Sequence, residues 1–141
     1  MEEDYTISYV DNPEESAWGI IGRGVGTYNE QQAGEDAFER LCFVVNSPGR
    51  GIVAGVVAEL YWNWLHVDLL WVKEELRGQG LGHRLLLKVE AEARKRGATD
   101  AFLDTFSFQA PDFYMKYGYR QFGELQDFPN GHQRLFLTKS L

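Results

Sequence analysis

The stretch that decides the fold is LHVDLLWVKEELRGQGLG, residues 65–82. Residues 65–72 form an apolar run that predicts a strand, and glycines at 78, 80 and 82 lead into an amphipathic helix over 81–96. Glycines let the backbone turn tightly and come close to a ligand. The helix directs free N–H groups and the positive end of its dipole into that turn. This strand, turn and helix together predict a binding site for phosphate oxygens.

The neighbouring residues indicate which class of phosphate compound this turn is expected to bind. No Lys-Ser/Thr pair follows the last glycine, which excludes a Walker loop, and the glycine spacing fits a dinucleotide fold poorly. Residues 69–72, followed after four residues by R-x-x-G-x-G at 77–82, resemble the acetyl-coenzyme A motif of the GNAT N-acetyltransferase superfamily. The block A-x-x-F-Y-x-x-x-G-Y at 110–119 resembles the late helix of that family. The resemblance implies acetyl-coenzyme A as co-substrate, with its pyrophosphate in the glycine turn.

The order of elements follows this family along the whole chain. Direct hairpins coexist with one strand–helix–strand crossover, which predicts an α/β protein of the α+β type with a mixed sheet. The resemblance implies a GNAT-like, mostly antiparallel central sheet of about seven strands flanked by helices. A single N-acetyltransferase domain is expected over residues 1–141. The predicted strands are 5–10, 38–47, 51–62, 63–72, 98–106, 119–125 and 134–139, and two predicted helices are 81–96 and 111–117.

The N-terminal segment has a helix start signal and an acidic composition. Asn12-Pro13-Glu14-Glu15 predicts a capped helix start, with Glu15 completing a capping box. Four glycines over 19–26 indicate close packing, mobility or a break into two short helices. Residues 1–40 hold ten acidic and two basic side chains. The resemblance implies that this segment forms one lip of the acceptor site, where acidic residues attract a cationic amine; the alternative is a solvated face.

The resemblance also implies which residues hold the coenzyme. Backbone N–H groups of the turn bind the pyrophosphate, while the end of the preceding strand pairs with the pantetheine arm and supplies an oxyanion donor. Ser107 stands where many members carry an asparagine that contacts the arm, and Gln109 is a candidate to compensate. Lys73, Arg84 and Lys88 either meet the remaining phosphate charge or are ordinary surface residues. The expected coenzyme-binding residues are Leu70, Trp71, Val72, Arg77, Gly78, Gln79, Gly80, Leu81, Gly82, Ser107 and Tyr114.

The catalytic candidates are Tyr114, His66 and Asp68. Tyr114 matches the tyrosine of the family's Phe-Tyr pair, and the resemblance implies that it is the acid for the leaving thiolate; the alternative is a core tyrosine. Period-2 alternation places residues 64, 66, 68 and 70 on one face of their strand. His66 and Asp68 are therefore a candidate base and orienting partner, or they deprotonate the amine through water. The alternative is a buried, hydrogen-bonded pair that stabilises the strand, and Glu59 is a third candidate base.

Composition excludes several functional classes. The 141 residues carry a net charge of −7 and no basic stripe, so no nucleic-acid partner is expected. No apolar run approaches ~18 residues, so no membrane partner is expected, and the acidic N-terminus is unlike a signal peptide, which favours the cytoplasm. Cys42 is the single cysteine, predicted to be a core residue, and no metal site is expected.

These observations predict an N-acetyltransferase that moves an acetyl group from acetyl-coenzyme A to a primary amine by direct attack. The acceptor is a small molecule, cationic amines included, or a peptide. The alternative is a non-catalytic acyl-coenzyme A sensing module on the same fold. The aromatic group Tyr61, Trp62, Trp64 and Trp71 forms either an acceptor pocket or a core or dimer interface, and the resemblance implies a homodimer.

Overall fold

The structure is a computed structural model that describes residues 4–141. The chain divides into two compact units, Met1–Asp36 and Ala37–Leu141, which are described separately. Within residues 4–141, no helix combines the length and the apolar character needed to span a bilayer.

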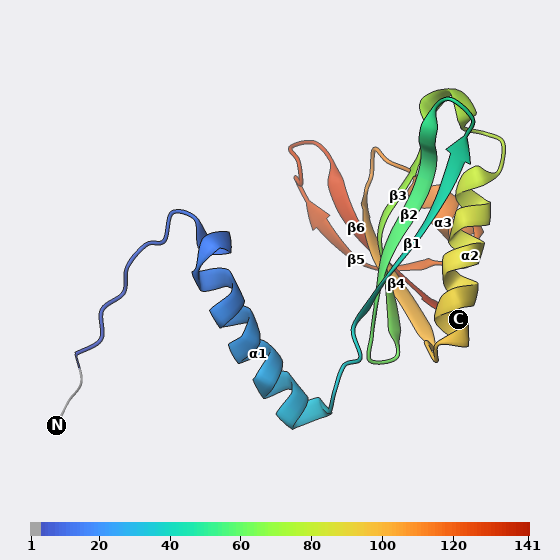
Figure 1. Cartoon of the computed structure of the whole chain (residues 1–141). Coiled ribbons are helices and arrows are strands. Elements are labelled where there is room, and N and C mark those ends of the chain that lie inside the picture. Colours follow the sequence, from blue (N-terminus) through green and yellow to red (C-terminus); the bar gives the residue numbers. More distant parts are fainter. Residues whose placement is uncertain (1–3) are drawn as a thin grey trace. The chain divides into compact units, whose positions relative to one another are not determined.

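The first unit holds a short 3-10 helix, η1 (Pro13–Glu15), and one longer helix, α1 (Ala17–Ala33), shown in Figure 1. Residues 5–10 have no regular secondary structure, so the predicted strand there is wrong. Alternation alone does not make a strand, because a strand is stable only when paired. Asn12 occupies the N-cap position of η1, but its side chain makes no capping hydrogen bond. Helix α1 runs unbroken for 17 residues, so its glycines do not divide it.

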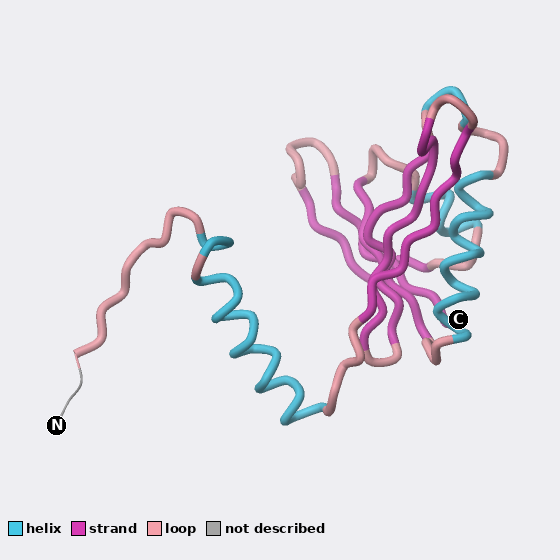
Figure 2. Tube along the Cα trace, viewed as in Figure 1, coloured by secondary structure: helices cyan, strands magenta, loops and turns pink. Residues whose placement is uncertain are grey.

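The second unit is built on a six-stranded sheet in the order β1-β2-β3-β4-β6-β5 (Figure 2). Strands β3 and β4 pair in parallel, and every other neighbouring pair is antiparallel. This confirms the predicted mixed sheet, with six strands where about seven were expected. The elements are β1 (Glu39–Ser47), β2 (Gly51–Tyr61), β3 (Trp64–Val72), η2 (Glu74–Leu76), α2 (Leu81–Lys95), β4 (Asp100–Phe106), α3 (Pro111–Lys116), β5 (Arg120–Gln126) and β6 (Gln133–Ser140).

Helix α2 covers one face of the sheet and shares the hydrophobic core with it (Figure 1). Its apolar positions recur at helical spacing, so Leu85, Leu86, Val89 and Ala93 all face the strands. Full burial of one leucine contributes about 1.5–3 kcal/mol, and this face therefore holds the helix in place. The strand residues of the core include Leu41, Val56, Ala58, Leu60, Leu65, Val67, Ala101, Leu103 and Leu137.

Cys42 is exposed, so its predicted place in the core is wrong. Strand β1 is an edge strand whose side chains alternate between the two faces of the sheet. Leu41, Phe43 and Val45 pack against the core under α2, which leaves Cys42 and Val44 on the other face. We call this second face, which points away from α2, the open face.

A β-bulge at Asp68 changes which residues of β3 reach the core. Val57 of β2 pairs with Leu69 and the next residue, Ala58, pairs with Val67, so Asp68 is the extra residue. One extra residue reverses the alternation of side chains beyond it. Leu70 therefore packs against the core, while Trp71 is exposed, opposite to the faces that unbroken alternation predicts.

Glu90 on α2 is a fully buried carboxylate. Its carboxylate accepts hydrogen bonds from the Tyr119 hydroxyl and from Lys139 Nζ, both at 2.8 Å. A buried carboxylate requires such partners, because an unpaired buried charge is very costly. The network joins α2 to β6 and to Tyr119, which lies just before β5. On the same helix, Glu92 forms an i,i+4 ion pair with Arg96 at 2.9 Å.

Candidate active site

The parallel pairing of β3 with β4 ends early and leaves the sheet forked. The paired residues are Trp64 with Asp100, Leu65 with Ala101, and His66 with Phe102. Both strands continue beyond the last pair, as residues 67–72 and 103–106, which we call the β3–β4 fork. Figure 2 shows the two halves of the sheet diverging toward this end. On its other edge β3 remains paired with β2 up to Val72, so its backbone on the fork side is available to an extended ligand.

The glycine turn, residues 77–82, leads from the end of β3 into α2. Gly78 and Gly80 have φ values of 78° and 85°, which residues other than glycine rarely adopt. Gly80 is the N-cap of α2. A Cβ at either position would meet no heavy atom within 4 Å, so the turn presents its backbone to open space. No side chain caps α2, and its first N–H groups therefore point into the turn without a helical acceptor.

Arg77, one of the expected coenzyme-binding residues, makes two hydrogen bonds within the protein. Its backbone N–H donates to Glu74 O at 3.2 Å, and its Nε donates to Val72 O at 3.0 Å. The residue therefore ties the turn to the last residue of β3, and the N–H groups of residues 78–82 are better placed to receive a phosphate. Gly82 lies against Phe113 and Val72: a Cβ added at Gly82 would be 3.5 Å from the Phe113 side chain and 3.8 Å from the Val72 side chain. Strand β3, α2 and α3 thus meet at the turn.

His66 lies at the base of the fork with its ring held from two sides. Its Nδ1 is 3.2 Å from Glu59 Oε1, and its ring stacks on Phe102 with centroids 4.6 Å apart. In the tautomer that donates its Nδ1–H to this carboxylate, Nε2 carries the lone pair. In that tautomer His66 Nε2 can accept a proton.

The contact of His66 Nδ1 is with Glu59, whereas Asp68 was the expected orienting partner. Residues Glu59 and His66 stand opposite each other on the antiparallel strands β2 and β3, which brings their side chains together. Asp68 is exposed in the bulge, and its carboxylate is still close: ligand atoms of Glu59, His66 and Asp68 all lie within 4.8 Å of one another. The three side chains form one polar cluster on the open face.

Tyr114 approaches from the other face of the sheet. Its ring packs against the core and makes edge contacts with Phe113 and Tyr119, with centroids 5.2 and 5.9 Å apart. Burial raises the pKa of Tyr114 to about 12. In the described part of the chain, no fully buried polar side-chain atom lacks a hydrogen-bond partner, and no hydrogen bond of the Tyr114 hydroxyl is found. The hydroxyl therefore reaches accessible space and remains protonated at neutral pH.

Ser107 and Gln109 hold the end of β4. Ser107 donates its backbone N–H to Gln133 O at 2.8 Å, and its Oγ accepts from Gln133 N at 2.9 Å. Gln109 Oε1 accepts from Thr105 Oγ1 at 3.0 Å and from Phe106 N at 2.8 Å. The Ser107 hydroxyl proton and the Gln109 amide group remain as donors toward a ligand.

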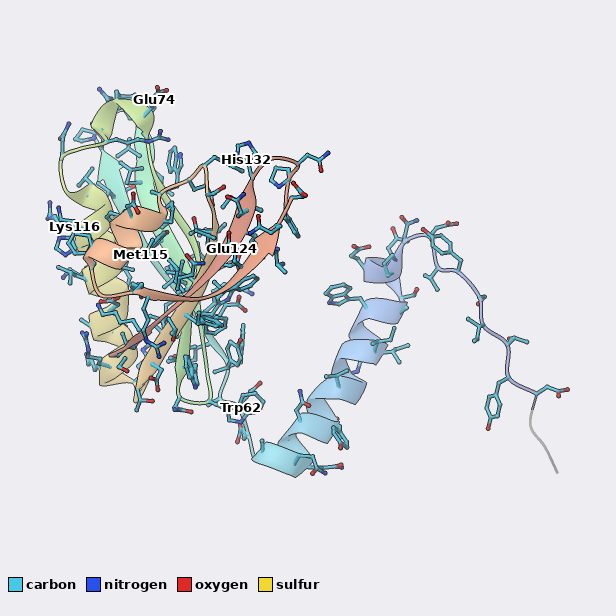
Figure 3. All side chains as sticks on the ribbon, turned by 180° about the vertical axis from the view of Figure 1, so that it is seen from behind. Trp62, Glu74, Met115, Lys116, Glu124 and His132 are labelled. Atoms are coloured by element: carbon cyan, nitrogen blue, oxygen red, sulfur yellow. The ribbon has the colours of Figure 1, made fainter. Side chains whose placement is uncertain are left out.

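Sequence reasoning missed an ion pair among aromatic rings on the open face. Arg134 donates from Nε and Nη2 to Asp104 Oδ1, at 2.9 and 2.8 Å. Its guanidinium lies 5.1–5.7 Å from three phenylalanine rings. Alternation along β4 could have found this face, because residues 102, 104 and 106 share it. The predicted aromatic group is also largely on the surface: Trp62, at the β2–β3 turn in Figure 3, and Trp71 are exposed.

Comparisons with known proteins agree with this geometry. Residues 6–119 match the acetyltransferase (GNAT) family. The chain is 44% identical over 91 residues to blasticidin-S acetyltransferase of Streptomyces morookaense, covering 64% of this chain and 67% of the relative. A crystal structure of an acetyltransferase from Bacillus cereus superposes with a TM-score of 0.85 at 35% identity, covering 98% of both chains. A streptothricin acetyltransferase from Bacillus anthracis, solved with acetyl coenzyme A, shares the fold at 17% identity and a TM-score of 0.64, over 72% of this chain and 62% of that one. The chain therefore belongs to the GNAT family of acetyltransferases.

Proposed function

We propose that this acetyltransferase transfers the acetyl group of acetyl-coenzyme A to a primary amine of a small cationic molecule at the β3–β4 fork. The observation that carries the proposal is the position of His66, at the last paired residue of β3, with Glu59 on Nδ1 and Nε2 free. An amine nucleophile needs a proton acceptor at the point where it meets the thioester.

The glycine turn and β3 are suited to the coenzyme. The turn offers backbone N–H groups and the positive end of α2 to the pyrophosphate. From there the pantetheine arm reaches the fork, where the backbone of residues 70–72 is available to pair with it. A backbone N–H of β3 would also donate to the acetyl oxygen as negative charge develops on it.

The proton transfers can be assigned to the two faces of the fork. The amine nitrogen forms the new bond to the acetyl carbon and gives its proton to His66 Nε2, while Glu59 stabilises the resulting imidazolium. The carbon–sulfur bond breaks, and the electron pair leaves with the sulfur. Tyr114, with a pKa of about 12, holds its proton more tightly than a thiol whose pKa is near 8.5. Its role is therefore to donate a hydrogen bond to the developing thiolate. The thiolate takes its final proton from the solvent, to which His66 releases the proton that it accepted from the amine.

The open face supports a cationic acceptor. The carboxylates of Glu59, Asp68 and Asp104 all come from its strands, and the guanidinium of Arg134 is already paired with Asp104. The rings of Trp64 and Phe102 lie beside His66, with centroids 6.0 Å apart, and aromatic faces attract cations. The name of the similar Streptomyces protein contains blasticidin S, so this compound is included among the acceptors to be tested.

The proposal is tested by following acetylated product by mass spectrometry. The panel holds blasticidin S, polyamines, aminoglycosides, free amino acids and peptides, each offered with acetyl-coenzyme A. We expect cationic small amines to be acetylated with the highest kcat/KM. A preference for neutral or anionic acceptors would contradict the assignment of the open face. Tight coenzyme binding without acetylation of any amine would instead favour an acyl-coenzyme A sensing module.

A further inference from the structure

The cluster of Glu59, His66 and Asp68 has the composition of a transition-metal site. It offers one imidazole nitrogen and two carboxylates, which are ligands that zinc accepts. All three ligand atoms lie within 4.8 Å of one another. Two carboxylates also balance the charge of a divalent ion.

The separation of the first two ligands fits a tetrahedral ion. Glu59 Oε1 and His66 Nδ1 are 3.2 Å apart. Two ligands about 2.0–2.1 Å from a tetrahedral zinc ion lie about 3.3 Å apart, so the ion could replace the proton that these atoms share. Asp68 is exposed at the bulge, which leaves its side chain free to turn toward the same point.

The backbone holds the first two ligands before any metal arrives. Glu59 and His66 are directly opposite each other in the β2–β3 ladder, and the His66 ring is fixed by its stack on Phe102. Arg40 is the cation opposite Glu59 on β1, and its guanidinium lies 5.7 Å from the Phe38 ring. A preorganised pair of ligands lowers the ordering cost of binding an ion.

We propose that Zn²⁺ binds between Glu59, His66 and Asp68 and holds His66 in a tautomer that cannot accept a proton. A metal ion on Nδ1 moves the one ring proton to Nε2. Catalysis needs the opposite tautomer, with the proton on Nδ1 and the lone pair on Nε2. Zinc is therefore an inhibitor of acetyl transfer here and not a cofactor. The inhibitory part rests on the proposed role of His66, and the binding part does not.

The binding test uses the full-length, tag-free protein after treatment with EDTA. Titration calorimetry with Zn²⁺ is expected to give one site per chain, and Mg²⁺, which prefers oxygen ligands, is expected to give none. Glu59→Gln and His66→Gln should each weaken zinc binding at least about tenfold, and Asp68→Asn should weaken it as well. Thermal unfolding of the metal-free variants verifies that they are folded.

Two substitutions serve as matched controls. His132→Gln removes an imidazole of the β5–β6 connection (Figure 3) that is not part of the cluster, and Cys42→Ser removes the single thiol. Both variants should bind zinc like the wild type. Wild-type binding by His66→Gln, or loss of binding in either control, would overturn the proposal.

The tautomer of His66 and the inhibition of acetyl transfer are measured in separate experiments. Nitrogen NMR of ¹⁵N-histidine-labelled protein should show the proton of His66 on Nδ1 without metal and on Nε2 with zinc. Acetylated product, measured by mass spectrometry, should decrease at least about tenfold at saturating zinc and recover with EDTA. If the tautomer changes as expected but metal-free protein acetylates no amine, the proposed function fails alone. If acetyl transfer proceeds unchanged at saturating zinc, the zinc proposal fails alone.

Discussion

At the scale of single residues, one carboxylate decides what His66 can do. Glu59 Oε1 lies 3.2 Å from Nδ1, and in the proposed mechanism this contact holds the tautomer whose Nε2 accepts the proton of the amine. Tyr114, on the other face, keeps its proton because burial raises its pKa to about 12. In the proposed mechanism, His66 is the proton acceptor and Tyr114 is the hydrogen-bond donor, on opposite faces of the sheet.

Loss of the His66 imidazole should slow acetyl transfer. We expect His66→Gln to lower kcat by about 10²-fold or more, because a positioned base contributes about 10²–10⁴-fold. Glu59→Gln should have a smaller effect on kcat and little on the KM for acetyl-coenzyme A, because Glu59 acts through His66. Steady-state kinetics of both variants beside His132→Gln measures this. A kcat in His66→Gln equal to that of the control would remove His66 from the mechanism.

Loss of the Tyr114 hydroxyl should also reduce turnover. We expect Tyr114→Phe to lower kcat more than about tenfold, because the developing thiolate loses a hydrogen-bond donor. Coenzyme affinity, measured by calorimetry, should change little. Tyr117→Phe on the same turn is the matched control and should retain activity. Equal turnover in the two variants would show that the Tyr114 hydroxyl has no part in catalysis and that Tyr114 is a core residue only.

At the scale of elements, the site depends on two backbone features. The bulge at Asp68 reverses the alternation of β3, so that Leu70 joins the core and Trp71 is exposed. The glycine turn leads the chain from η2 into α2, with Gly80 in the left-handed region. The first feature arranges the open face, and the second directs the N-terminus of α2 toward the coenzyme.

The two glycines at the start of α2 should respond differently to alanine. Gly80 has a φ of 85°, where a Cβ costs roughly 1–2 kcal/mol, so Gly80→Ala should distort the turn and weaken coenzyme A binding. Gly82→Ala adds a Cβ that meets Phe113 at an ordinary 3.5 Å and should bind nearly like the wild type. Calorimetric titration with coenzyme A compares them. Equal affinities would show that the left-handed turn is not needed for binding.

At the scale of the whole molecule, buried polar groups connect the layers of the second unit. Glu90 on α2 binds both Tyr119 and Lys139, and burial with the neighbouring Glu90 carboxylate raises the pKa of Tyr119 above its ordinary value. Tyr114 lies beside Tyr119, and burial raises the pKa of Tyr114 as well. Both phenols are therefore neutral in the folded protein at pH values where the unfolded chain ionises them.

This difference predicts a loss of stability at alkaline pH. A raised folded pKa contributes stability that is complete below the unfolded value, near 10, and is lost as pH rises through the folded value, about 12 for Tyr114. The free energy of unfolding, from urea denaturation at pH 8 to 11.5, should therefore decline with pH above 10. Tyr114→Phe should show a shallower decline, and Tyr28→Phe, at an exposed tyrosine, should follow the wild type. Parallel curves for all three proteins would contradict the assignment.

The sequence by itself determined the order and type of nearly all elements and the glycine turn, because these depend on local spacing. Alternation, helical periodicity and glycines act within a few residues, so the helix predicted at 81–96 is α2 and the strand predicted at 51–62 is β2. The family follows from the same local motifs. The expected homodimer and the cytoplasmic location stay predictions.

Only the tertiary structure decided which polar groups meet. The bulge at Asp68 depends on the register of β2 against β3, and the pairing of Glu59 with His66 follows from that register. Glu90 is buried because Tyr119 and Lys139 arrive from distant parts of the chain. Residues 5–10 alternate like a strand and have no regular structure. Spacing within one segment carries no information about the partner segment, whereas register, burial and hydrogen bonding across strands are properties of the pair.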